Sequence, residues 1–92
     1  MIEYTSNEDQ LIAELKEYVD STYGEHYQGN HALEAWRRKG ILLEAAESNL
    51  WKYLERFGRK EGHNEKDLWK MIHYLLFMID ELRVRKANGE VD

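Results

Sequence analysis

Residues 64–87 read NEKDLWKMIHYLLFMIDELRVRKA, and this stretch indicates the fold more strongly than any other part of the chain. Its apolar residues recur at steps of four, three, four and three, which is the spacing of one face of an α-helix. They are Leu68, Ile72, Leu75, Ile79 and Leu82. We therefore expect a long helix that starts after Asn64 and continues to about Lys86.

A second apolar stripe makes the surface of this helix wider than one partner helix would cover. Its members are Met71, Leu75, Met78 and Leu82, with Trp69, Leu76 and Phe77 close by. We expect the helix to meet another subunit, so that the protein is a homo-oligomer, either a dimer or a tetramer.

The rest of the chain is also typical of helices, because it contains no proline and only six glycines. A first helix is expected from near Thr5 or Ser6, where Thr5-x-x-Glu8 resembles a capping box, to about residue 20 or 21. An ordered loop is expected over residues 21–30, then a short helix that begins at Asn30 and stops at Gly40. A third helix should cover about residues 42–57 and end before Gly58. The sequence predicts an all-α bundle of about four helices.

Composition narrows the class of protein. With 92 residues the chain is expected to form one domain over residues 1–92, and 34% charged residues leave only a thin apolar core. A net charge of −5 argues against binding to duplex nucleic acid through its phosphates. The chain contains no cysteine and no apolar segment of membrane-spanning length, so we expect no membrane partner and a cytoplasmic location.

Basic residues gather in one short segment of the third helix. Lys52, Arg56, Arg59 and Lys60 stand against Glu55 alone. The residues that helical spacing is expected to place on one face are Asn49, Lys52, Tyr53, Arg56 and Lys60. Arginine and lysine bind phosphate, while tyrosine and asparagine can contact a base or sugar, so this face is a candidate nucleotide site. The alternative is a solvated helix face whose cations pair with Glu47, Glu55 or acidic residues of the first helix.

Metal and catalytic motifs are poorly represented. The four histidines form no metal-binding pattern, and His26 and Tyr27 are better explained as ligand contacts or loop anchors. Glu44-x-x-Glu47 matches the first half of a magnesium motif found in all-α nucleotide pyrophosphatases, but the second half, near Asp67, is poor. No P-loop or nucleophile motif is present. We expect no metal site, no cofactor and no catalytic residue.

Three segments together resemble a widespread family of small bacteriophage proteins. They are HYQG at 26–29 with Glu34, SNLWKYLERFGRKEG at 48–62, and KDLWKMIHYL at 66–75. Some longer relatives in that family are kinases of deoxynucleoside monophosphates. The resemblance implies functional roles for His26, Tyr27, Asn49, Lys52, Tyr53, Arg56, Lys60, Asp67, Lys70 and Tyr74. Ser48 departs from the pattern, which usually has glycine there, and the chain is shorter than the kinase-like members.

The resemblance and the basic face lead to one expected function with two alternatives. The chain looks like the sponge proteins with which phages sequester host immune nucleotides, such as the cyclic dinucleotides of CBASS defence. Such a protein would act in the host cytoplasm and bind its ligand without chemistry. The alternatives are a nucleotide kinase or other nucleotide enzyme, and an inhibitor that binds a host enzyme.

Overall fold

The computed structural model describes residues 1–25 and 29–90, and within these ranges it contains four helices and no strand. The helices are α1 (Glu8–Glu25), α2 (Gly29–Lys39), α3 (Leu42–Arg56) and α4 (Glu65–Ala87). This confirms the expected all-α architecture with a long C-terminal helix. None of these helices is both long and apolar enough to cross a bilayer.

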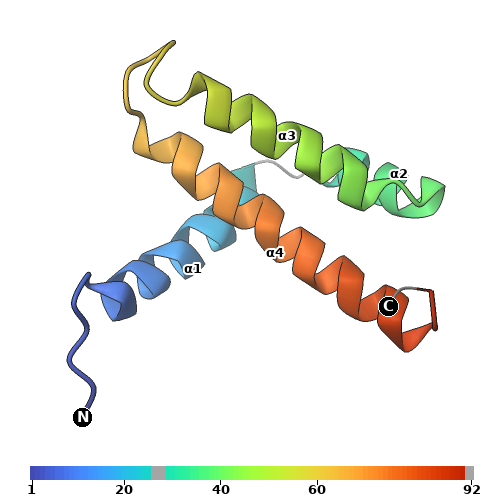
Figure 1. Cartoon of the computed structure of the whole chain (residues 1–92), viewed down its shortest axis with the longest axis horizontal. Coiled ribbons are helices and arrows are strands. Elements are labelled where there is room, and N and C mark those ends of the chain that lie inside the picture. Colours follow the sequence, from blue (N-terminus) through green and yellow to red (C-terminus); the bar gives the residue numbers. More distant parts are fainter. Residues whose placement is uncertain (26–28, 91–92) are drawn as a thin grey trace.

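Helices α3 and α4 form an antiparallel hairpin that makes up most of the packed structure (Figure 1). Helix α2 lies at the start of α3. Helix α1 crosses α4, where Tyr18 stacks on Trp69 with 6.2 Å between ring centroids and meets His73 edge-on at 5.9 Å. The N-terminal part of α1 extends away from the hairpin, and its Ile12 side chain is 64% exposed.

The apolar interior is small, as the composition predicts. Leu42 and Ala46 are fully buried and Tyr53 is almost so, and all three belong to α3. On the α4 side the interior is completed by aromatic rings, since Tyr74 lies 6.1 Å from Tyr53 and 6.0 Å from Phe77 between ring centroids. A core of this size leaves many large apolar side chains in contact with water.

Charged side chains also contribute to the interior. Glu81 of α4 is buried and accepts a hydrogen bond from Arg85 Nε at 2.9 Å, while Arg37 Nη1 of α2 lies 3.4 Å from its other oxygen. Arg85 Nη2 also donates to the carbonyl oxygen of Gly40 at 3.1 Å. These contacts tie the C-terminal end of α2 to α4.

Two expectations for the N-terminal region are wrong. Helix α1 continues to Glu25, so residues 21–25 are helical, and Asn30 lies inside α2. Ser21 and Thr22, which often favour loops, are accommodated because their hydroxyls donate to backbone carbonyls one turn earlier, both at 2.7 Å. Residues 26–28 of the expected loop lie outside the described residues.

The expected Thr5 cap is not formed either. Helix α1 begins at Glu8, and the Glu8 carboxylate accepts from the backbone N–H of Ser6 at 2.8 Å. By contrast, the start of α4 is where the sequence predicts it. Asn64 caps this helix, with its Oδ1 accepting from the N–H of Lys66 at 3.0 Å.

Candidate functional site

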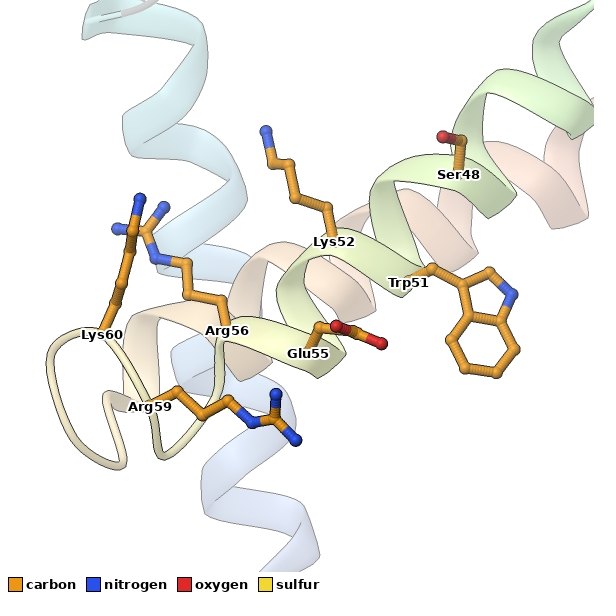
Figure 2. A pocket seen from close by; sticks show the side chains of 7 residues that line it. All are labelled: Ser48, Trp51, Lys52, Glu55, Arg56, Arg59 and Lys60. Atoms are coloured by element: carbon orange, nitrogen blue, oxygen red, sulfur yellow. The ribbon is translucent and has the colours of Figure 1, made fainter.

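An open hollow of about 820 Å³ lies along the second half of α3 and the turn that follows it. Figure 2 shows the side chains around it, and those of Lys52, Arg56 and Lys60 point in the same direction. The complete lining is Ser48, Trp51, Lys52, Glu55, Arg56, Arg59 and Lys60. Four of these seven residues are cationic and one is acidic, so the hollow is locally basic on a chain whose net charge is −5.

Helical spacing and a tight turn together produce this arrangement. Lys52 and Arg56 are one turn apart on α3 and share a face. The helical path ends at Phe57, which is extended with ψ at 121°, and Gly58 follows with φ at +85°. The backbone N–H groups of Arg59 and Lys60 then both donate to the carbonyl of Arg56, at 2.9 and 3.3 Å. The expectation that Lys60 lies on the helix face is therefore wrong. The turn, rather than the helix, brings Lys60 beside Arg56.

Three of the four cations are exposed to solvent. Among the described residues, no carboxylate lies within ion-pair distance of Lys52, Arg59 or Lys60. The C-terminal end of α3 carries the negative end of the helix dipole, which favours cations in its last turn. Arg56 is the cation in that last turn. Lys52, Arg59 and Lys60 have no carboxylate partner among the described residues, so their side chains are available to an anionic ligand.

Arg56 differs from the other three because it is partly committed to the protein. Its Nη2 lies 3.7 Å from Glu61 Oε2, and its Nε lies 3.8 Å from Oδ1 of Asp67, which is 2% exposed. The Nε is buried and has no hydrogen-bond partner within the described structure. The cation pairing considered as the alternative thus holds for Arg56, although its partners are Glu61 and Asp67 rather than Glu47, Glu55 or α1.

Two of the three expected site tyrosines, Tyr53 and Tyr74, lie between α3 and α4. Tyr53 is buried, and its ring has Lys52 Nζ at 4.8 Å and Lys70 Nζ at 5.3 Å from the centroid. Burial raises the pKa of Tyr74, and the neighbouring Tyr53 and Tyr18 raise it further. Both rings serve as packing, and Tyr53 is not placed to stack on a base. Lys70 reaches the same ring as Lys52 from the opposite helix.

Of the remaining expected site residues, Asn49 is half-buried and donates through Nδ2 to the carbonyl of Ala45 at 2.9 Å. Its amide therefore satisfies its own helix and does not line the hollow. His26 and Tyr27 lie outside the described residues, so their predicted contact with a ligand stays a prediction.

Trp51 and Arg59 line the hollow but were not among the expected site residues. Trp51 is 62% exposed, which is unusual for the largest side chain. Its exposure could have been read from the sequence, because Ser48, Trp51 and Glu55 fall at helical spacing on one side of α3, with two polar members. Figure 2 shows the indole pointing away from Lys52, Arg56 and Lys60, so it offers an aromatic ligand a stacking surface that is separate from these three cations.

The acidic residues of the half-matched magnesium motif do not converge. Within residues 1–25 and 29–90, no group of three or more histidine or acidic side chains is placed to hold a metal ion. Glu44 and Glu47 are exposed on α3, Asp67 is buried against Arg56, and Asp80 lies 3.4 Å from Arg37.

Comparisons of the chain with protein-family models, with curated proteins and with solved structures give no match. The fold and the site geometry are therefore the observations on which a function can be argued.

Proposed function

We propose that the protein binds a phosphate-bearing nucleotide in the basic hollow and sequesters it without chemical change. The observation that carries this proposal is the convergence of Lys52, Arg56 and Lys60 on one side of an open hollow that Trp51 also lines. Arginine can hold a phosphate through two parallel hydrogen bonds, lysine acts as a mobile point charge, and an indole stacks on a base.

The ligand class we favour is a cyclic dinucleotide of the kind used in bacterial CBASS immunity. Its two phosphates match a site with several cations, and the exposed Trp51 ring is a separate stacking surface that lines the same hollow. The resemblance of residues 26–75 to small phage proteins supports a role in immune evasion in the host cytoplasm. Within this proposal Lys70 lies at the edge of the site, because its Nζ is 5.3 Å from the centroid of the Tyr53 ring, which Lys52 also contacts.

Sequestration is favoured over phosphoryl transfer because that reaction needs cations or a metal around the moving group together with a positioned base. Glu55 is the acidic side chain among the residues that line the hollow, and Figure 2 shows it pointing away from the group formed by Lys52, Arg56 and Lys60. The lining therefore offers groups that hold an anion, and its own carboxylate points away from them. The Glu61 carboxylate, which is not part of the lining, lies 3.7 Å from Arg56 Nη2 and is paired with that guanidinium.

Binding is tested by calorimetric titration of the protein with cyclic dinucleotides, with linear dinucleotides and nucleoside monophosphates as further ligands. Lys60→Ala should weaken binding about tenfold or more, since one charge-assisted phosphate contact is removed. Lys39→Ala is the matched control, because Lys39 is an exposed lysine at the end of α2, away from the hollow. Trp51→Ala should also weaken binding, whereas equal affinities for Lys60→Ala and wild type would contradict the site.

The absence of chemistry is tested separately. After incubation with Mg²⁺ and ATP, the bound nucleotide is released by heat and separated by chromatography, and it should be recovered unchanged. Glu44→Gln should bind as the wild type does. Conversion of the ligand, or phosphate transfer to a deoxynucleoside monophosphate over many turnovers, would instead establish the kinase-like alternative.

A further inference from the structure

Helix α4 presents its most regular apolar stripe to solvent rather than to α3. Leu68, Leu75, Ile79 and Leu82 are exposed at 40%, 46%, 48% and 37%, and Leu76 beside them at 41%. Ile72, the fifth member of this stripe, is half-buried. Isolated exposed leucines are ordinary on protein surfaces, but four exposed members of one apolar stripe over four turns of a helix are not.

A different line of residues on α4 makes the contacts with α2 and α3. Asp67 faces Arg56, Tyr74 faces Tyr53 and Trp36, and Glu81 faces Arg37. The leucines at 68, 75 and 82 directly follow these three inward-facing residues in the sequence. Each leucine is therefore rotated by about 100° around the helix axis from the residue before it. The hairpin therefore uses a mixed polar and aromatic face and leaves Leu68, Leu75, Ile79 and Leu82 uncovered.

Charged residues continue this uncovered face at both ends. Glu65, Ile72, Ile79 and Lys86 follow one another at intervals of seven residues and lie along one line of the helix. Glu65 stands at the first turn and Lys86 at the last, and both are exposed. The line thus runs from a negative end, through an apolar middle, to a positive end.

We propose that a second copy of this chain covers the stripe, with the two α4 helices antiparallel. In that arrangement the negative end of each helix lies beside the positive end of the other, and the two apolar segments meet in the middle. A parallel arrangement would instead place Glu65 beside Glu65 and Lys86 beside Lys86, which is repulsive. The face is complementary to itself only in the antiparallel sense.

This pairing does not depend on the nucleotide proposal. The basic hollow is built on α3 and the following turn, whereas the exposed residues of the stripe all belong to α4. Each copy would carry its own complete hollow, so loss of pairing should leave nucleotide binding in place.

Light scattering on the full chain tests the pairing, with an expected mass of twice 11.0 kDa at micromolar concentration. Leu75→Glu should raise the dissociation constant more than about a hundredfold, because it places a charge in the middle of an apolar contact. Helical circular dichroism should be retained, since Leu75 is exposed in the single chain. Leu54→Glu on α3 is the control, because Leu54 is 54% exposed but lies off the stripe, and this variant should stay paired.

Charge reversal tests the orientation. Lys86→Glu should weaken pairing about tenfold in the antiparallel arrangement, and adding Glu65→Lys to it should restore wild-type pairing. In a parallel arrangement Lys86 would lie beside Lys86 of the other copy, and the single reversal would replace two like positive charges by two like negative charges. The affinity of pairing would then change little. A wild-type mass of 11 kDa, a Leu75→Glu variant that pairs normally, or a Lys86→Glu variant with unchanged affinity would each overturn the proposal.

Discussion

Arg56 Nε lies 3.8 Å from Oδ1 of Asp67, so one guanidinium belongs both to the surface of the basic hollow and to the contact between α3 and α4. The Asp67 side chain is 3% exposed, while the Arg56 side chain is 32% exposed. The pair thus joins a buried anion to a cation that a ligand can reach. Any change to Arg56 should affect both folding and binding.

Arg56→Ala should lower the free energy of unfolding by about 1 to 3 kcal/mol, because the buried Asp67 carboxylate loses its counter-charge. Adding Asp67→Asn should recover part of that loss by removing the stranded charge. Urea denaturation of the two single variants, the double variant and wild type measures this coupling. Additive effects of the two substitutions would show that the pair contributes nothing to stability.

For ligand binding, Arg56→Ala should cost more affinity than Arg59→Ala. Figure 2 shows Arg56 pointing the same way as Lys52 and Lys60, whereas Arg59 points to another side of the turn. The expected loss for Arg56→Ala is about tenfold to a hundredfold, the value of one charge-assisted clamp. Calorimetry below the unfolding transition of each variant separates weaker binding from loss of fold, and equal losses for the two arginines would contradict the assignment.

Gly58→Ala should be more destabilising than Gly62→Ala. Both glycines have positive φ, +85° and +70°, where an alanine costs about 1 to 2 kcal/mol. At Gly58 an added Cβ would also lie 2.7 Å from His63 Nε2, whereas at Gly62 nothing lies within 4 Å. Thermal unfolding compares the two variants. His63→Ala combined with Gly58→Ala should bring the cost down to that of Gly62→Ala.

Glu81→Gln should destabilise the fold by about 1 to 3 kcal/mol, because the buried carboxylate accepts from Arg85 and faces Arg37. Asp80→Asn is the control, since Asp80 is exposed and lies 3.4 Å from Arg37 alone, and its cost should stay below about 0.5 kcal/mol. Denaturation midpoints in urea give both values. Similar midpoints for the two variants would show that the contacts of Glu81 with Arg85 and Arg37 do not hold α2 against α4.

Acidification should destabilise the protein through His73. Burial lowers the pKa of His73 below its ordinary value of 6.5, so the unfolded chain takes up a proton at a higher pH than the folded one does. The stability associated with neutral His73 is fully present above about pH 6.5 and is lost as the pH falls through the folded pKa. The urea midpoint should therefore fall less on acidification for His73→Gln than for wild type, with His63→Gln, at an exposed position, behaving as wild type does.

Helices and helix ends that depend on neighbouring residues could be predicted from the sequence. The three- and four-residue periodicity of α4, the stop at Gly58 and the start at Asn64 depend on neighbouring residues, and the structure confirms them. The end of α1 could not be predicted in the same way. Ser21 and Thr22 favour a loop or a helix according to where their hydroxyls donate, and that choice is settled within the folded chain.

Which face of α4 packs inward was decided by tertiary structure alone. Periodicity shows that Leu68, Leu75 and Leu82 share a face, but it does not say which partner that face meets. In the folded chain α3 brings Arg56 and Tyr53 to Asp67 and Tyr74, so a charged and aromatic face is buried while the leucines remain exposed. The same holds at the basic hollow, where sequence placed Lys52 and Arg56 on one turn of helix. Only the fold showed that Tyr53 turns inward, because this depends on its contact with Tyr74 of α4. Lys60 is placed by a local turn at Gly58, and helical spacing does not describe the positions of residues beyond such a turn.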